Sequence, residues 1–355
     1  MNVISVGTAT PYDIYQQRGI LADAGDYCRR VNRGDRALIV TDSNVGPLYA
    51  QTAVDSLTAA GYQTEVFTFE AGEQSKTLAT VEAIYDRLAA ASFSRADLLV
   101  ALGGGVTGDM TGFAAATWMR GIDFVQIPTS LLAQVDSSVG GKTGVDIPSG
   151  KNLIGAFWQP RLVLLDADVL QTLKPAVFAD GMAEVIKTAC IKDAALFERL
   201  AADAAHDPDQ IESVIAACVS IKRDVVERDE RESGERKLLN FGHTLGHALE
   251  KYYHYTALSH GSAVAVGMCI LSAAAERAGL TATGTTARIA QVLQQYHLPT
   301  ADPAAPWDYL SAVLHDKKRV GTAIDLVLLE QIGVGFVHRM PVDEVERFVT
   351  GAYAV

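Results

Sequence analysis

Apolar runs and helix-like segments alternate through the first half of the chain, and this alternation constrains the fold more than any other feature. Segments such as Thr77–Ala91 show helical periodicity, and they separate β-branched, apolar runs that end in polar or glycine-rich breaks. The runs predicted as strands are Arg36–Asn44, Thr64–Gly72, Asp97–Gly105, Asp123–Ser130 and Arg161–Leu170. Alternating strands and helices predict an α/β, Rossmann-like domain whose mainly parallel sheet is covered on both faces.

The pattern changes after Leu173–Gly181, and nearly everything from there to about His315 favours helix. Pro208–Glu232 is one long amphipathic segment. Near the end, Ala323–Gly333 and Gly333–Val337 resemble two short strands, which predicts a small hairpin. We therefore expect a boundary near Pro175, with an α/β domain over residues 1–175 and a mainly α-helical domain over residues 176–355.

Composition excludes several classes of protein. The chain has 355 residues, a net charge of -12 and a pI near 5.1, which argue against general binding to nucleic acids or anionic membranes. Its 4 cysteines are far apart and form no CxxC pair, so we expect buried, reduced thiols. The N-terminal residues do not resemble a signal peptide, and Ser262–Ala275 is too short for a bilayer span. These features predict a soluble, cytoplasmic protein.

A glycine turn follows the third predicted strand. Gly103, Gly105 and Gly108 match GxGxxG between a strand and a helix, where backbone N–H groups and the helix dipole favour a pyrophosphate. The usual acidic residue at the end of the next strand is missing, because Asp123 precedes that strand. The turn predicts dinucleotide binding, though not in the ordinary Rossmann manner, and a turn without a ligand is the alternative.

Two further segments carry candidate polar contacts. Glu70–Leu78 places Glu73 where it could accept hydrogen bonds from ribose hydroxyls and Lys76 where it could meet a phosphate, although a solvated helix start fits equally well. Gln134–Pro160 resembles a long, glycine-rich loop with lysines suited to phosphate or carboxylate oxygens. A flexible surface loop is the alternative for this second segment.

The helical half contains a candidate metal site. Three histidines lie within 18 residues. Two of them, His243 and His247, belong to Leu238–Glu250, which we expect to be one helix, and their spacing places them on one face of it. Either these two histidines bind a metal with one carboxylate, or Glu184, His243 and His260 bind it and His247 stays free. Spacing alone does not choose between the two arrangements.

Seven motifs, spread in order over about Asp42–Lys318, resemble those of the 3-dehydroquinate synthase family of sugar-phosphate cyclases. They are GEQSKTL, GGGVTGDMTGFAAATWMRG, IPTSLLAQVDSSVGGKTGVDIPSGKNLIGAFWQP, GMAEVIKTACI, LLNFGHTLGHALE, LSHGSAVAVGM and HDKK. The resemblance implies that Glu184, His243 and His260 hold zinc or cobalt, and that His247 faces the substrate as a proton-handling group.

The resemblance also implies roles for other residues. The positions implied to contact NAD are Glu73, Gln74, Lys76, Gly105, Val106, Gly108, Asp109, Thr129, Ser130, Asp136, Lys142, Lys151 and Thr172. Those implied to hold the substrate's phosphate, carboxylate and hydroxyls are Lys142, Asn152, Lys187, Lys222, Arg236, Asn240 and Lys318. Arg120 is implied to reach into the neighbouring subunit of a homodimer. Some members of the family carry Asn where Asp146 stands here, which leaves the contacts of that loop open.

The implied reaction converts 3-deoxy-D-arabino-heptulosonate 7-phosphate into 3-dehydroquinate and phosphate in the shikimate pathway. NAD would take a hydride and return it, and the metal would act as a Lewis acid. The alternatives are a cyclase of the 2-deoxy-scyllo-inosose or 2-epi-5-epi-valiolone type, a metal-dependent alcohol dehydrogenase and a catalytically inactive binding protein. Lys222 and Arg236 favour a carboxylate-bearing substrate, because a neutral sugar phosphate needs fewer cationic partners.

Overall fold

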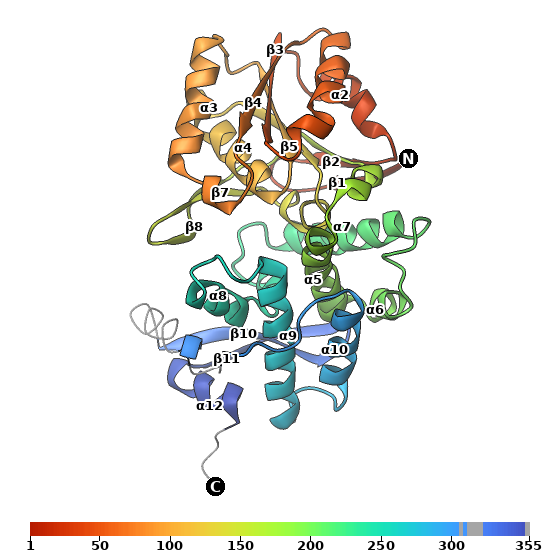
Figure 1. The fold of residues 1–355 in the computed structure, drawn as a ribbon, viewed down its shortest axis with the longest axis vertical. Coiled ribbons are helices and arrows are strands. Elements are labelled where there is room, and N and C mark those ends of the chain that lie inside the picture. The colour runs from red at the N-terminus through yellow and green to blue at the C-terminus, as the bar shows by residue number, and fades with distance from the viewer. Residues whose placement is uncertain (305–307, 311–321, 352–355) are drawn as a thin grey trace. The chain divides into compact units, whose positions relative to one another are not determined.

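In the computed structural model, which describes residues 1–304, 308–310 and 322–351, a seven-stranded sheet organises the first part of the chain (Figure 1). The strand order is β1-β2-β9-β6-β5-β3-β4, and all neighbouring strands are parallel except β1 and β2. The strands are β1 (Asn2–Val6), β2 (Tyr12–Gln16), β3 (Arg36–Asp42), β4 (Gln63–Phe69), β5 (Leu98–Gly103), β6 (Asp123–Pro128) and β9 (Leu162–Leu165). The predicted parallel α/β sheet is confirmed.

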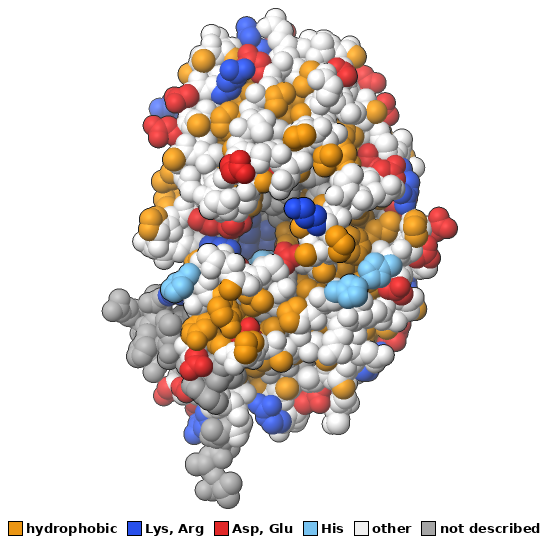
Figure 2. Space-filling model, in the orientation of Figure 1, with side chains coloured by type: hydrophobic (Ala, Val, Ile, Leu, Met, Phe, Trp, Pro, Cys, Tyr) orange, Lys and Arg blue, Asp and Glu red, His pale blue; other side chains and the backbone are white. Residues whose placement is uncertain are grey.

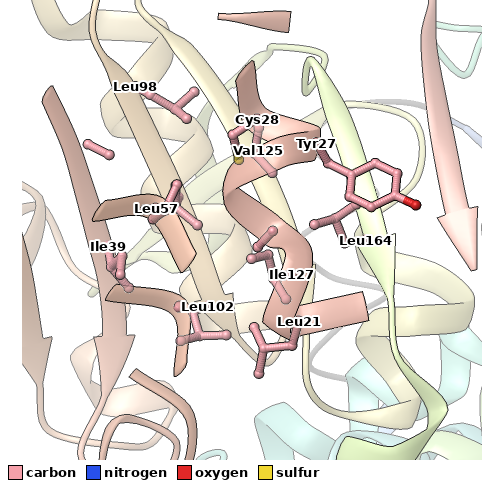
Figure 3. Packing of buried hydrophobic residues seen from close by; sticks show 14 of the residues in the cluster. Leu21, Tyr27, Cys28, Ile39, Leu57, Leu98, Leu102, Val125, Ile127 and Leu164 are labelled. Carbon is pink, nitrogen blue, oxygen red and sulfur yellow. The ribbon is translucent and has the colours of Figure 1, made fainter. Parts of the chain in front are cut away.

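Helices cover both faces of this sheet. They are α1 (Ala24–Val31), α2 (Gly46–Ala59), α3 (Leu78–Ala90) and α4 (Gly105–Thr117). Side chains alternate along each buried strand, so that Ile39 of β3 packs in one apolar cluster while Leu38 and Val40 pack in another. Figure 3 shows the first cluster, where Leu57 of α2 lies near strand residues of the sheet. Burial on both faces explains why these strands are almost continuously apolar.

The second part of the chain is mainly helical, as predicted. Its helices are α5 (Pro175–Lys192), α6 (Ala194–Ala201), α7 (Ile211–Arg228), α8 (His243–Tyr252), α9 (His260–Arg277), α10 (Thr285–Gln295) and α12 (Val345–Thr350). The predicted hairpin is formed by β10 (Ala323–Gln331) and β11 (Val334–Pro341), which pair antiparallel. Short helical turns link these elements and those of the sheet: η1 (Ile20–Asp23), η2 (Glu73–Ser75), η3 (Trp118–Arg120), η4 (Ala133–Ser137), η5 (Ala167–Thr172), η6 (Glu235–Asn240) and η7 (Val342–Glu344).

The chain forms two compact units. The first comprises Met1–Leu173 and Lys222–Arg231, and the second comprises Lys174–Ile221 and Glu232–Val355. The C-terminal part of α7 therefore belongs to the first unit, although it follows the expected boundary near Pro175 in sequence. On the face shown in Figure 2, acidic and basic side chains are scattered over each unit.

Three local predictions were wrong. Most of the expected loop Gln134–Pro160 is an antiparallel hairpin of β7 (Lys142–Ile147) and β8 (Gly150–Phe157), preceded by the π-helical turn η4. The strand expected over Arg161–Leu170 ends at Leu165, because the side chain of Asp166 accepts a hydrogen bond from the N–H of Asp168 and begins η5.

The third error concerns Leu238–Glu250, which was expected to be one helix. Gly242 has a φ of 82°, so the chain breaks there and α8 begins at His243. His243 and His247 still lie one turn apart on the same helix. All 4 cysteines are free and buried, as predicted. Within the described residues, no helix combines the length and apolar character that crossing a bilayer requires.

Candidate functional site

Three ligand-type side chains converge in the second unit. Glu184 lies in the middle of α5, His243 is the first residue of α8, and His260 is the first residue of α9. Glu184 Oε1 lies 3.4 Å from His243 Nε2 and 3.7 Å from His260 Nε2. A tetrahedral zinc ion with bonds of about 2.0–2.1 Å separates its ligand atoms by roughly 3.3 Å. The spacing therefore suits a metal ion at the centre of the three atoms.

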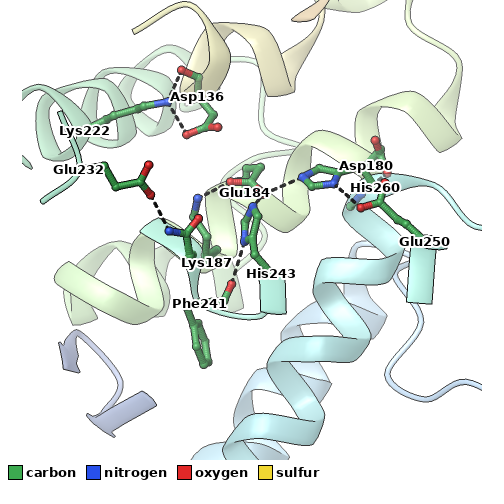
Figure 4. A network of polar contacts seen from close by, with 12 residues as sticks. Asp136, Asp180, Glu184, Lys187, Lys222, Glu232, Phe241, His243, Glu250 and His260 are labelled. Atoms are coloured by element: carbon green, nitrogen blue, oxygen red, sulfur yellow. Dashed lines mark hydrogen bonds and ion pairs between the residues drawn. The ribbon is translucent and has the colours of Figure 1, made fainter. Parts of the chain in front are cut away.

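The hydrogen bonds of the cluster also fit a metal ion bound by these three side chains. Glu184 Oε1 is buried and has no hydrogen-bond partner, which is rare for a polar atom in a protein interior. Each histidine has an acceptor at its other ring nitrogen: the backbone oxygen of Phe241 lies 3.2 Å from His243 Nδ1, and Glu250 Oε2 lies 3.3 Å from His260 Nδ1. Such partners place the proton on Nδ1 and leave the Nε2 lone pair available. Figure 4 shows the imidazole of His260 between Glu184 and Glu250.

The electrostatics of the cluster differ between the two rings. Burial, together with the charge of Lys187 and the neighbouring histidines, holds the pKa of His243 well below its usual value, so this ring is neutral at pH 7. Burial also favours neutral His260, but the hydrogen bond with Glu250 and the charge of Glu184 outweigh it and raise the pKa of His260. Lys187, one turn from Glu184 on α5, forms an ion pair with its other carboxylate oxygen.

Close helix packing brings the ligands together. A Cβ atom on Gly267 of α9 would lie 2.1 Å from the backbone oxygen of Gly242, and one on Gly246 would lie 3.1 Å from the backbone of α9. Only glycine allows α8 and α9 to approach this closely. Asp180, one turn before Glu184, accepts a hydrogen bond of 2.6 Å from the N–H of Gly261. That bond ties the start of α9 to the helix that carries Glu184.

His247 does not join His243 around a common point. Among the described residues, ligand atoms of three such side chains converge in two groups: Glu184 with His243 and His260, and His247 with Glu250 and His260. Neither group contains both members of the pair. The His247 side chain is exposed, and its ring centre lies 5.4 Å from that of His243. Of the two arrangements left open by the sequence, the geometry favours Glu184, His243 and His260, with His247 beside them.

Other predicted residues of this unit lie on the turn before α8. Arg236 and Asn240 belong to η6; the Arg236 side chain is almost fully buried, and Asn240 Nδ2 donates a hydrogen bond of 2.7 Å to Glu232 Oε1. Lys318 lies outside the described residues. Sequence reasoning missed three acids here: Glu232, Asp180 and Glu250. The last two were detectable, because Glu250 lies two turns after His243 and Asp180 lies one turn before Glu184.

The glycine turn of the first unit forms as predicted. β5 ends at Gly103 and α4 begins at Gly105, with no side chain capping its free N–H groups. A Cβ on Gly108 would lie 2.7 Å from Gln126 Oε1 on the neighbouring strand β6, and one on Gly105 would lie 3.1 Å from Ser137 Oγ. These glycines let the start of α4, where Val106 also lies, pack closely against β6 and η4. The arrangement suits a phosphate group.

Lys76 is the centre of a polar cluster beside this turn. Its Nζ lies 2.7 Å from Asp109 Oδ2 on α4 and donates a hydrogen bond of 2.6 Å to Asn152 Oδ1 on β8. Burial opposes its charge, but the carboxylates of Asp109 and Glu73 outweigh burial and raise the pKa of Lys76. Lys151 Nζ lies 3.6 Å from Glu73 Oε1. The structure thus brings together predicted nucleotide and substrate contacts on η2, α4 and the β7–β8 hairpin.

Asp146 belongs to this cluster through backbone contacts. Its Oδ1 accepts a hydrogen bond of 2.8 Å from the N–H of Asn152, and its own N–H donates to the backbone oxygen of Lys76. The carbonyl oxygen of an asparagine could accept the same bond. An asparagine at position 146 is therefore compatible with the observed contacts of this loop.

The remaining predicted residues of the first unit are more dispersed. The N–H of Thr129, at the end of β6, donates to Gly103 O, and Ser130 Oγ lies near Gly104. Thr172 Oγ1 lies 2.7 Å from the hydroxyl of Tyr49. Lys222 Nζ lies 2.6 Å from Asp136 Oδ1, so these two predicted contacts form an ion pair.

Three further predicted residues have exposed side chains. Lys142 is exposed at the start of β7, and Gln74 lies on η2, where its amide bonds to the backbone oxygen of Ala71. Arg120 is exposed after α4 and has a φ of 69°, in the left-handed region that is uncommon for residues other than glycine.

Comparison with solved structures identifies the class of protein that shares this fold. The chain superposes on a 2-deoxy-scyllo-inosose synthase complexed with carbaglucose-6-phosphate, NAD+ and Co2+ with a TM-score of 0.88 and 27% identity, covering 98% of this chain and 100% of that one. A 2-epi-5-epi-valiolone synthase from Streptomyces hygroscopicus with NAD+ and Zn2+ bound gives a TM-score of 0.86 at 27% identity, covering 96% of each chain. An iron-containing alcohol dehydrogenase shares the fold alone, with a TM-score of 0.64 and 16% identity. The fold is that of the sugar-phosphate cyclases.

Sequence relatives narrow the class further. Residues 66–180 match the model of the 3-dehydroquinate synthase N-terminal domain, and residues 181–319 match that of the C-terminal domain. A 3-dehydroquinate synthase from Clostridium beijerinckii is 44% identical over 346 residues, covering 96% of this chain and 98% of the relative. One from Streptococcus sanguinis is 45% identical over 346 residues, covering 96% and 97%. The chain belongs to the 3-dehydroquinate synthase family.

Proposed function

We propose that this protein is a 3-dehydroquinate synthase, a carbon–oxygen lyase that converts 3-deoxy-D-arabino-heptulosonate 7-phosphate into 3-dehydroquinate and inorganic phosphate. Family membership over nearly the whole chain supports the reaction. The observation that carries the proposal within the structure is the convergence of Glu184, His243 and His260 on one point, where the buried Glu184 Oε1 has no hydrogen-bond partner. In the shikimate pathway this step closes the carbocyclic ring.

The proposed cofactors are NAD and one divalent metal, zinc or cobalt. When bound, NAD supplies a reversible hydride acceptor and the metal supplies Lewis acidity for the reacting hydroxyl and carbonyl oxygens. Glu184, His243 and His260 would hold the metal, and a Glu/His/His donor set suits either ion. The glycine turn after β5 would hold the dinucleotide's phosphates, with Glu73, Lys76 and Asp109 around it.

Two side chains near the proposed metal site, Lys187 and His247, are assigned roles in the reaction. Elimination of phosphate requires loss of a weakly acidic carbon-bound proton, and negative charge develops on neighbouring oxygens. Lys187 is buried against Glu184, so its ammonium group is a fixed, poorly solvated positive charge at that place. His247 is exposed beside the ligand cluster and has a ring that can accept and return a proton. We assign it the proton-handling role.

Substrate discrimination is proposed to depend on cationic side chains. Arg236 is almost fully buried on η6, where its guanidinium is a fixed positive charge with a fork of donors that suits a carboxylate. The proposed substrate carries a carboxylate, whereas the sugar phosphates used by sibling cyclases lack that group. We assign the binding of the substrate's phosphate, carboxylate and hydroxyls to Lys142, Asn152, Lys187, Lys222, Arg236, Asn240 and Lys318.

The assembly and cellular location are also proposed. Arg120, exposed and held in a left-handed conformation after α4, would complete the phosphate site of a second subunit in a homodimer. The 4 free, buried cysteines fit a reducing compartment, so we place the enzyme in the cytoplasm.

One assay separates the possible activities. Purified protein is incubated with the heptulosonate phosphate, Co2+ or Zn2+ and a trace of NAD, and both phosphate and NADH are measured. The proposal expects phosphate release far in excess of NAD, with no accumulation of NADH. Net NADH formation would instead identify a dehydrogenase. Turnover of a neutral heptulose phosphate, but not of the acid, would identify a sibling cyclase.

A further inference from the structure

Glu250 is a buried acid that neither the family resemblance nor the comparisons assign. Its side chain is only 2% exposed, and it lies on the last turns of α8, two turns after His243. Burying a carboxylate without partners is costly, so a retained buried acid calls for a specific contact. Glu250 Oε2 lies 3.3 Å from Nδ1 of His260, while Nε2 of the same ring faces Glu184 at 3.7 Å.

We propose that Glu250 is a positioning residue of the metal site: it accepts a hydrogen bond from Nδ1 of His260 and thereby directs Nε2 of that ring toward the metal. The inference rests on the metal site proposed above. A neutral imidazole carries its proton on one nitrogen only, and a carboxylate can only accept. The carboxylate therefore selects the tautomer whose Nε2 lone pair faces Glu184.

The two histidine ligands obtain the same orientation in different ways. For His243 the acceptor is the backbone oxygen of Phe241, two residues earlier, which no side-chain substitution removes. His260 begins α9 directly after its N-cap Ser259, and its acceptor comes from another helix. The orientation of His260 thus depends on a single replaceable side chain.

A direct ligand role for Glu250 is the competing interpretation. His247, Glu250 and His260 also bring ligand atoms within 4.8 Å of one another. A metal there would need Nδ1 of His260, while the first site uses Nε2, so one ring would have to bridge two ions as an imidazolate. A neutral ring between one metal and one carboxylate is the ordinary arrangement for a histidine ligand. We therefore assign Glu250 to the hydrogen bond.

The test measures metal binding without substrate. Metal-free wild type, E250A and E250Q are titrated with Co2+ in competition with a chelator, and the visible spectrum of bound Co2+ is recorded. E250A is expected to bind Co2+ about 10–100-fold more weakly, with altered d–d bands, because second-sphere partners of histidine ligands have effects of this size. E250Q keeps the size of the side chain and an acceptor oxygen but loses the charge, so we expect a loss of about tenfold at most.

E276A is the matched control. Glu276 is a carboxylate near the other end of α9, where it accepts a hydrogen bond from the N–H of Gly284. Its loss should lower stability without changing the affinity for Co2+. An equal loss of affinity in E276A would show that any damage to α9 weakens the site, and it would overturn the inference. Because E250Q preserves volume, it provides the test if E250A does not fold.

Three further outcomes are decisive. Wild-type affinity and spectrum in both E250A and E250Q would overturn the positioning role and leave the proposed function intact. A fall from two bound ions to one in E250A would show that Glu250 is a ligand, and would also overturn it. A wild-type protein that binds no divalent ion would overturn the proposed function together with the inference.

Discussion

Replacing Gly267 with alanine should separate α8 from α9 and weaken the metal site from a distance. The added Cβ would lie 2.1 Å from the backbone oxygen of Gly242, whereas ordinary contacts begin at 3.4 Å, so the helices must move apart by about 1.3 Å. His243 follows Gly242 directly and must move with it. Metal sites tolerate ligand displacements of only about 0.2 Å. We therefore expect G267A to bind Co2+ about 100-fold more weakly, at the upper end of second-sphere effects.

The same substitution should also destabilise the metal-free protein. Overpacking a well-packed interior costs about 1–3 kcal/mol, because backbone or side chains must shift to relieve the contact. Chemical denaturation followed by circular dichroism measures this loss, and Co2+ titration of the folded protein measures affinity. A loss of stability alone would not explain weak metal binding, so the two quantities must be compared in a control variant.

G25A provides that control. A Cβ on Gly25 of α1 would lie 2.1 Å from the backbone oxygen of Ser56 on α2, which is as severe a contact as the one at Gly267. Neither helix carries a proposed ligand. G25A should lose a similar amount of stability and keep wild-type affinity for Co2+. The reasoning fails if G267A binds Co2+ as tightly as wild type, or if G25A loses as much affinity as G267A.

Three other substitutions test separate contacts. K187M removes the buried partner of Glu184 and should destabilise the metal-free protein by about 3–5 kcal/mol. In thermal unfolding, Zn2+ should stabilise the variant more than it stabilises wild type. Equal stabilisation by Zn2+ would contradict the role of Glu184 as a ligand. D146N should change the free energy of unfolding by less than about 1 kcal/mol in denaturant titrations, because an amide oxygen can still accept the hydrogen bond from the N–H of Asn152. A large loss of stability would mean that the negative charge of Asp146 is itself required. Burial opposes the charge of Glu276, but hydrogen bonds from Thr286 and Gly284 outweigh burial and lower the pKa of Glu276 below its usual value. The stability that the charged carboxylate contributes is therefore present above the unfolded pKa of about 4.3, and it is lost as the pH falls through the folded pKa. E276Q should therefore be about 1 kcal/mol less stable than wild type at pH 7, and the difference should vanish in acid; a difference independent of pH would refute the argument.

Local patterns predicted the sheet, the glycine turn and the pair of histidines on one helix, but not the full set of proposed ligands. Strands such as Leu98–Gly103 are buried on both faces, so their sequences are continuous apolar runs that can be recognised without a structure. The turn at Gly105 and the spacing of His243 and His247 on one helix are equally local. The resemblance to the family then selected Glu184 and His260, which are too far apart in sequence for spacing to connect them.

The main error was the loop expected over Gln134–Pro160, because glycine occurs both in loops and where two strands or helices approach closely. In Gln134–Pro160 the glycines suggested a loop, yet Gly144 and Gly155 face each other across the β7–β8 ladder. A Cβ on Gly155 would lie 2.2 Å from the backbone oxygen of Thr143, so these glycines permit close approach of two strands. The same use occurs between α8 and α9. A close approach depends on a partner distant in sequence, and a single sequence does not identify that partner.

The position of the ligands at helix starts has an electrostatic consequence. His243 and His260 are the first residues of α8 and α9, where the helix dipoles place partial positive charge. That charge opposes a cation, so two histidines alone would make a weak metal site here. The two negative charges of the buried carboxylates Glu184 and Glu250 balance a divalent ion. The carboxylate of Asp180, at the start of α9, offsets the two helix ends, and the ammonium group of Lys187 then leaves an excess of positive charge. Such a site attracts anionic oxygens, which is the requirement for a substrate that carries both a carboxylate and a phosphate.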